Sequence, residues 1–160
     1  MSEAAAKAFE LFRADVGNDE ATGDWFQVTQ EQIDQFADVT HDHQFIHVDP
    51  EKAKQTPFGT TIAHGFLTLS MLTHLSGSTS SGPVDPGKYA GMVMGINYGF
   101  NRVRFVSPVK VGGRIRGRAV TANAELKGNT VEVTRNFTVE IEGEEKPALV
   151  AEWVVRTVYG

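Results

Sequence analysis

The sequence predicts an α+β fold in which a long antiparallel β-sheet wraps around one central helix. The first half of the chain favours helices, whereas apolar and polar residues alternate with a period of two after Tyr89. A third observation is the segment from Ile62 to about Ser76, which has helical spacing and is apolar around most of its circumference. Such a helix is usually buried, so the strands that follow are expected to cover it.

The elements of the first half follow from local signals. Residues 2–15 are expected to form an amphipathic helix, and residues 25–28 a short strand. Thr29 is the expected N-cap of a second helix, because Gln32 stands three residues later as in a capping box. Asp49-Pro50 is expected to begin a short helical turn.

Four long strands are expected in the second half, after a loop at residues 76–87 that is rich in Gly, Ser and Pro. Lys127-Gly128-Asn129 and Glu142-Gly143-Glu144 are expected as tight hairpin turns. The predicted strands are Met92–Phe105, Arg114–Leu126, Asn129–Ile141 and Ala148–Val158. We expect one domain over residues 1–160, in which residues 1–20 are an N-terminal helical extension.

The composition restricts the class of protein. With 41% hydrophobic and 22% charged residues, the chain has the composition of a soluble globular protein. A net charge of −5 argues against a nucleic-acid partner. The absence of cysteine excludes disulfides and thiolate chemistry and is compatible with a reducing compartment. Neither a secretory signal nor the ~20 apolar residues of a membrane span is found, so a cytoplasmic protein without a membrane partner is expected.

The polar segment between residues 40 and 50 holds the first candidate site. Asp42 and His47 lie five residues apart, and a bent loop can bring them together around one water molecule. Three interpretations are open: a solvated polar loop, a metal site, or an acid–base pair of Asp42 and His47. The metal site would use His41, Asp42, His43 and His47, whose spacing does not match a zinc helix motif.

The second candidate lies at the start of the central helix, at His64-Gly65. Because Gly65 has no side chain, a ligand oxygen could approach its N–H closely, and that N–H could stabilise negative charge developing on the oxygen. The alternative is that Gly65 permits close packing of helix against sheet, while His64 caps the helix or packs.

The third candidate is basic. Arg114, Arg116 and Arg118 alternate along a strand and share one face, with Arg102 and Arg104 shortly before them. These side chains could attract the phosphates of a substrate. The alternative is the solvated face of a half-buried strand.

Taken in order, these elements resemble a known family. The Asp/His loop, TPFGTTIAHGF, the buried helix and INYGFNRVRFVSPVKVGGRIR are similar to the MaoC-like (R)-specific enoyl-CoA hydratases, with the NodN-like branch closest. The resemblance extends from about Trp25 to the C-terminus. It implies a hot-dog fold, usually paired into a homodimer with a continuous sheet.

The resemblance also implies residue roles. Asp42 and His47 would hold the catalytic water, and the Gly65 N–H would bind the thioester oxygen. Thr73 would support the pair through its hydroxyl, with Gln44 and His64 as further supporting residues. Arg102, Arg104, Arg114 and Arg116 are the candidate substrate-binding residues. Neither a metal nor an organic cofactor is expected, because the CoA thioester is itself the substrate.

Two positions depart from the family pattern. His41 stands where relatives usually carry glycine, and Gln44-Phe45 replaces the common Asn-Pro. The expected reaction is reversible syn addition of water to trans-2-enoyl-CoA, which gives (R)-3-hydroxyacyl-CoA. An acyl-CoA thioesterase on the same fold and a non-catalytic acyl-CoA-binding module are the alternatives.

Overall fold

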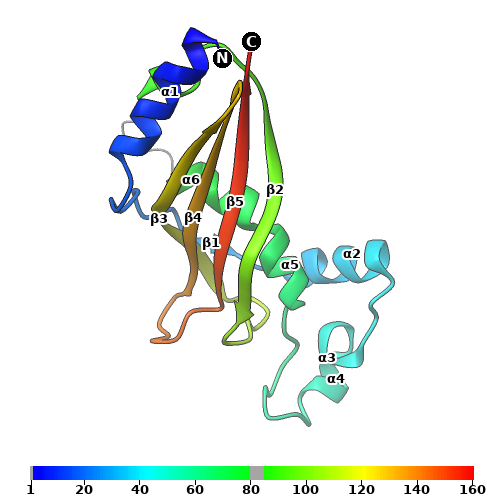
Figure 1. Ribbon diagram of the computed structural model, residues 1–160. Helices are drawn as coiled ribbons and strands as arrows, with labels where there is room; N and C mark the ends of the chain where they lie inside the picture. The colour runs from blue at the N-terminus through cyan, green and yellow to red at the C-terminus, as the bar shows by residue number, and fades with distance from the viewer. Residues whose placement is uncertain (1, 80–84) are drawn as a thin grey trace.

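The computed structural model describes residues 2–79 and 85–160. Within these ranges the strands form one antiparallel sheet in the order β1-β3-β4-β5-β2, which curls around the central helices (Figure 1). Residues 80–84 of the predicted loop lie outside the described residues. The strands are β1 Phe26–Gln27, β2 Met92–Phe105, β3 Arg114–Lys127, β4 Thr130–Ile141 and β5 Leu149–Tyr159. The helices are α1 Glu3–Ala14, α2 Gln30–Thr40, α3 Phe45–Val48, α4 Pro50–Ala53, α5 Gly65–Ser70, α6 Leu72–Thr79 and the 3₁₀ turn η1 Pro86–Lys88.

The wrapped sheet is the architecture that the sequence predicts. The four long strands begin and end within one residue of their predicted bounds. Gly128 and Gly143 take positive φ angles of 63° and 79° in the turns that join β3 to β4 and β4 to β5. Glycine adopts this left-handed conformation without steric cost, which is why these two turns can be so short.

The central helix differs from its prediction. It begins at Gly65 rather than Ile62 and is divided at Met71 into α5 and α6. Its start is delayed because Ala63 N donates to Val109 O at 2.7 Å, which keeps this segment extended beside the sheet. The division follows two hydroxyls that donate to carbonyls of the preceding turn, Ser70 to Phe66 O and Thr73 to Ser70 O, a pattern that often bends helices.

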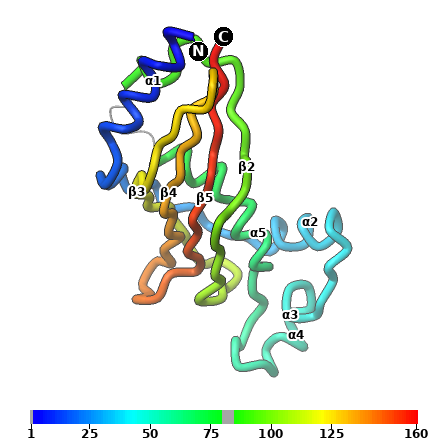
Figure 2. Tube along the Cα trace, viewed as in Figure 1, coloured from blue at the N-terminus to red at the C-terminus, as the bar shows by residue number. Residues whose placement is uncertain are grey.

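The inner face of the sheet is divided between two sets of helices. Leu72 and Leu75 of α6 pack with Phe137 and Trp153 in the main core. A second apolar cluster lies at the other end of the sheet, where α1 covers it (Figures 1 and 2). The second cluster consists of Ala5, Ala8, Phe12, Ala124, Val131, Val133 and Tyr159.

The segment α2–α4 projects to the side of the sheet on which β2 lies (Figure 2). Its first helix begins with the expected capping box, in which Thr29 and Gln32 exchange hydrogen bonds, and Asp49 caps α4 as predicted. The projecting segment is joined back to the body by the extended residues 61–64, and this connection places the candidate loop beside the start of α5.

Strand β2 is an edge strand whose outer side has no partner strand within the described ranges. Most of its residues are exposed, although many are apolar. The large exposed apolar residues of β2 are Met92, Val93, Met94, Ile96, Tyr98, Phe100 and Phe105. In the same described ranges, no helix combines the length and apolarity that crossing a membrane requires.

Candidate active site

The Asp/His loop begins at a left-handed residue. Helix α2 ends at Thr40, and His41 follows as its C-cap with φ 61° and ψ 21°. This conformation turns the chain sharply and delivers Asp42 to the start of α5. The left-handed φ also accounts for glycine at this position in the resembling family, because a side chain there carries a steric cost.

His47 is buried and held by its backbone surroundings. Only 6% of the residue is exposed. Its Nδ1 lies 2.7 Å from the carbonyl oxygen of Ile62, and the Gln30 side-chain amide donates to the His47 carbonyl at 2.8 Å. A carbonyl oxygen can only accept, so Nδ1 must carry the proton of the neutral ring. The free lone pair of His47 is therefore on Nε2.

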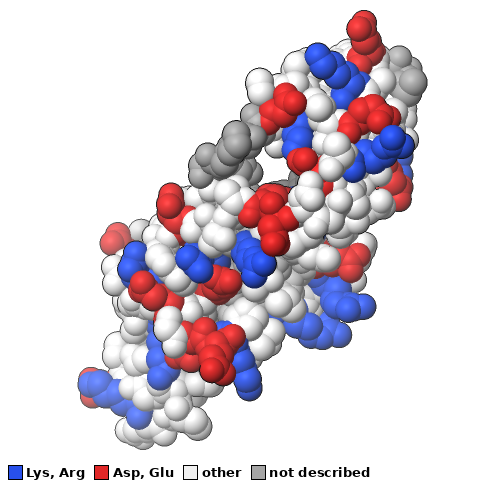
Figure 3. Space-filling model, turned by 90° about the vertical axis from the view of Figure 1, so that its left-hand side faces the viewer, with Lys and Arg blue, Asp and Glu red and all other residues white. Residues whose placement is uncertain are grey.

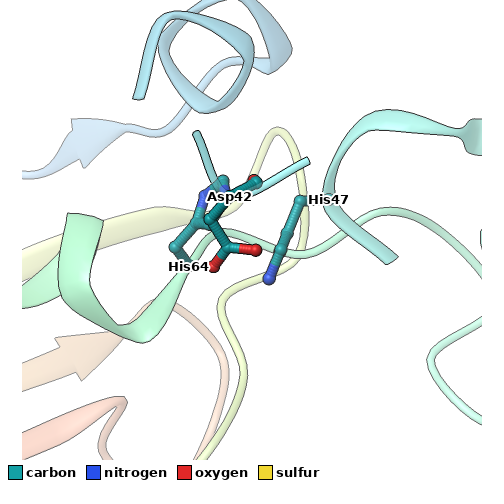
Figure 4. Close-up of side chains that lie close together, drawn as sticks. All are labelled: Asp42, His47 and His64. Carbon is teal, nitrogen blue, oxygen red and sulfur yellow. The ribbon is translucent and has the colours of Figure 1, made fainter. Parts of the chain in front are cut away.

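A second imidazole stands directly beside His47. His64 is 2% exposed, and its ring stacks on that of His47 with centroids 3.8 Å apart and planes 24° apart. His64 Nε2 lies 2.9 Å from the backbone oxygen of Asp42. Each of the three residues offers a side-chain atom within 4.8 Å of the others, and Figure 4 shows the Asp42 carboxylate between the two rings in this view.

Burial sets the protonation of His47. Desolvation lowers the pKa of this imidazole below its ordinary value of 6.5, and the neighbouring His64 lowers it further. The Ile62 carbonyl and the Asp42 carboxylate oppose this by favouring the charged form, but burial is the largest influence. His47 is therefore neutral near pH 7, with Nε2 available to accept a hydrogen bond.

An apolar cavity of about 320 Å³ opens beside this group. Gly65 lies on its wall, and a methyl group at Gly65 would stand 3.0 Å from the Phe105 ring. As the first residue of α5, Gly65 has an N–H without an acceptor inside the helix. The cavity is also lined by His47, Phe58, Ile62, Thr68, Val106 and Pro108.

The group of Asp42, His47 and His64 contains ligand types that metals use. Stacked rings, however, direct their in-plane lone pairs side by side rather than toward one point. A metal bound by both imidazoles would require at least one ring to turn out of the stack. The histidine cluster considered from the sequence, with His41 and His43, does not form either, because both side chains are exposed and His43 pairs with Asp38 at 2.8 Å.

Two of the predicted supporting residues form no side-chain hydrogen bond with this group in the described part of the chain. Thr73 is exposed on α6, and its hydroxyl donates to Ser70 O at 3.3 Å. Gln44 is exposed at the start of α3 and makes no side-chain capping bond. Their supporting roles therefore stay predictions, whereas His64 is in direct contact with the pair.

Two of the predicted substrate-binding arginines are engaged in ion pairs. Arg114 lies 2.9 Å from Glu142, and Arg116 lies 2.7 Å from Glu140. Both point away from the central helix, because the residues between and beside them on β3 are buried against it. Pairing of this kind is common on the molecule, and Figure 3 shows basic and acidic side chains intermixed over the face that carries α1.

Arg102 and Arg104 lie in a different setting, on the edge strand β2. They are exposed, and neither is in an ion pair with any residue that the structure describes. Arg104 donates to the Val103 carbonyl at 2.8 Å. Arg102 is three residues before Phe105 and Arg104 is one residue before it, and Phe105 lines the cavity.

Three contributors to the site carry no local signal in the sequence. Gln30 supports the His47 backbone and also accepts the Thr61 hydroxyl at 2.5 Å. Phe36 contacts His64 with ring centroids 5.1 Å apart. The Ile62 carbonyl selects the tautomer of His47. All three act across the fold, so only the tertiary structure could identify them.

The sheet wrapped around α5 and α6, with Asp42, His47 and His64 close together beside an apolar cavity, has the architecture of a hot-dog protein. The sequence from residue 12 to residue 142 matches the family model described as MaoC like domain. The chain belongs to the MaoC-like dehydratase family, as the resemblance predicted.

Individual relatives agree with this assignment. The chain is 50% identical over 151 residues to Nodulation protein N of Rhizobium leguminosarum bv. viciae, covering 91% of this chain and 90% of that protein. It is 48% identical over 146 residues to 3-hydroxyacyl-thioester dehydratase Z of Mycobacterium tuberculosis, covering 91% and 92%. Among solved structures, a monoamine oxidase regulatory protein from Archaeoglobus superposes with a TM-score of 0.73 at 26% identity, covering 91% of each chain.

Proposed function

We propose that this protein catalyses the reversible syn addition of water to trans-2-enoyl-CoA, giving (R)-3-hydroxyacyl-CoA. The observation that carries the proposal is the convergence of the Asp42 carboxylate and the neutral, buried His47 beside an apolar cavity that Gly65 also lines. The relative named as a 3-hydroxyacyl-thioester dehydratase supports the same reaction type.

The proposed mechanism uses one water molecule held by the pair. The Asp42 carboxylate accepts a proton while the water oxygen attacks C3, and His47 orients the water through Nε2. The electron pair of the C2=C3 bond moves toward the thioester oxygen, where the Gly65 N–H stabilises the developing charge. The enolate then takes a proton at C2 from the protonated pair. Addition is syn because the oxygen and the proton come from the same side.

The proposal requires neither a metal nor an organic cofactor, because the thioester itself accepts the electron pair. The CoA phosphates would remain outside the apolar cavity. Arg102 and Arg104 are the better candidates to bind them, since Arg114 and Arg116 are already paired with carboxylates. The cysteine-free sequence is compatible with the proposed cytoplasmic location.

We also propose that the protein is a homodimer that pairs through β2. A long, exposed and apolar edge strand is a template for pairing with another chain, and an apolar surface of this kind usually marks an interaction site. The projecting segment α2–α4 lies on the same side as this edge and would then contact the second copy (Figure 1).

The hydration reaction is tested by following the absorbance of the conjugated thioester of crotonyl-CoA. Wild type should remove it without release of free thiol and should form the (R)-3-hydroxy product. Asp42→Asn and His47→Gln should each lose about two to four orders of magnitude in turnover. Thiol release would instead indicate a thioesterase, and binding of acyl-CoA without turnover would indicate a binding module.

The same region of the chain offers a matched control. Asp38 and His43 are also five residues apart and are hydrogen-bonded at 2.8 Å, but both are exposed. Asp38→Asn and His43→Gln should therefore keep wild-type turnover. Near-normal hydration by the Asp42 and His47 variants would overturn the assignment of the pair.

A further inference from the structure

His64 touches both members of the proposed acid–base pair, Asp42 through its Nε2 atom and His47 through its ring face. Its ring contacts the rings of both Phe36 and His47. Its Nε2 reaches the backbone of Asp42, 22 residues earlier in the chain. Its own backbone begins α5, since the His64 carbonyl accepts from Thr68 N at 3.1 Å.

The protonation of the His64 ring follows from its partners. The Asp42 carbonyl oxygen can only accept, so Nε2 must be the protonated nitrogen of the neutral ring. Nδ1 is then left with a buried lone pair that has no hydrogen-bond partner among the described residues. A buried, unsatisfied acceptor costs free energy. An apolar ring would fill the same space without this cost, but it could not make the Nε2–H hydrogen bond to Asp42.

The Asp42 backbone needs such a support. Asp42 is exposed and follows the left-handed residue that ends α2. Within the described part of the chain, its carboxylate forms no ion pair or hydrogen bond. The bond from His64 therefore ties the Asp42 main chain to the start of the helix that also carries Gly65.

We infer that His64 is a positioning residue for hydration, whose Nε2–H bond to the Asp42 carbonyl holds the carboxylate in place against His47. The inference rests on the proposed function. It gives His64 no contact with the substrate. It explains why a buried imidazole is stacked on another at this point of the fold.

Two variants separate the ring from its N–H group. His64→Phe keeps an aromatic ring in the stack but cannot donate to Asp42. His64→Gln loses the ring but offers a side-chain N–H where Nε2 stands. We expect His64→Phe to lower kcat about 100-fold, the scale of a misplacement near 1 Å, with KM changed less than about threefold. His64→Gln should recover part of that loss.

A matched ring replacement is available as a control. His74 lies on α6, is exposed and contacts Phe26 with ring centroids 4.7 Å apart. His74→Phe should leave kcat and KM unchanged. The melting temperature of each variant should be recorded, because a loss of kcat that merely follows a loss of folded protein would contradict a positioning role.

A second readout does not depend on turnover. The carbonyl-carbon NMR resonance of Asp42 reports its hydrogen bond directly. It should move in His64→Phe and return toward wild type in His64→Gln. A wild-type protein that hydrates no enoyl thioester would overturn the proposed function, whereas this NMR result would still support the contact. Wild-type kcat in His64→Phe, or an unmoved Asp42 resonance, would overturn the inference.

Discussion

At the scale of single residues, burial divides the five histidines of this chain into two groups. His47 and His64 are buried, while His41, His43 and His74 are exposed. Exposed imidazoles exchange partners with water, but each of the two buried rings has one nitrogen at a backbone carbonyl, which fixes the tautomer of its neutral form. The Ile62 carbonyl thus determines which nitrogen of His47 would face the water of the proposed mechanism.

The burial of His47 predicts the pH dependence of the reaction. In the proposed mechanism the neutral ring is the active form, and the pKa of His47 is lowered from 6.5. As the pH falls, activity is therefore retained through 6.5 and lost only below it. The charged or titratable groups that face this ring are Asp42 from the loop and His64 from the start of α5. The measurement is kcat/KM against pH; an acid limb centred above 6.5 would contradict the neutral form of His47.

The sequence could propose Asp42 and His47 as a pair because both lie in one short loop and match the motif of the resembling family, and their catalytic roles stay predictions. It could not identify the hydrogen bonds that orient them. The contact from His47 to Ile62 spans 15 residues, and the contact from His64 to Asp42 spans 22. Such contacts depend on how α5 meets the loop, and no local pattern encodes that meeting.

At the scale of elements, the start of α5 shows how tertiary contacts override a local pattern. Helical spacing begins at Ile62, but the chain stays extended to His64. The hydrogen bond from Ala63 to Val109 competes with helix formation and wins. The strands were predictable to within a residue because alternation and turn glycines agree there. The start of the helix was not predictable, because the competing hydrogen bond is to Val109, on a distant segment.

The close approach of Gly65 and Phe105 yields a prediction for this element. Gly65→Ala places a methyl group 3.0–3.2 Å from three ring atoms of Phe105, so the ring must shift. We expect turnover to fall about tenfold or more, because the cavity wall and the N–H move together. The double variant Gly65→Ala/Phe105→Ala should recover turnover relative to Gly65→Ala. Wild-type turnover in Gly65→Ala would show that this wall is not required.

Helix α1 is expected to contribute stability without taking part in the chemistry. Phe12 is 9% exposed and packs in the second cluster, at the end of the sheet away from α2–α4 (Figure 1). Phe12→Ala should lower the free energy of unfolding by about 3 kcal/mol, measured by urea denaturation. The kcat of the folded protein should stay unchanged. Val16→Ala, at an exposed position just after α1, is the control and should have little effect.

At the scale of the whole molecule, the apolar edge predicts the oligomeric state. Light scattering should give twice the 17.5 kDa mass of one chain. Ile96→Lys should shift this mass toward one chain, because a lysine on an edge strand disfavours pairing. Val16→Lys is a matched control, since Val16 and Ile96 are 41% and 40% exposed. A single-chain mass for wild type at micromolar concentration would contradict the dimer.

The division of the sheet between α1 and the central helices places the second apolar cluster away from the proposed active site. The cluster under α1 lies at one end, and the Asp/His loop lies at the other (Figures 1 and 2). The sequence predicted both helices from their spacing. It did not predict that they share one face of the sheet, because a helical period shows that a face is buried but not which surface buries it.

The left-handed backbone at residue 41 has a consequence for the variation that this position accepts. Its φ of 61° suits glycine and asparagine, and it excludes proline and disfavours valine, isoleucine and threonine. A library randomised at position 41 and selected for turnover should therefore return glycine, asparagine and aspartate beside histidine. Such an outcome would mean that turnover depends on the backbone conformation at position 41 and does not require the imidazole side chain.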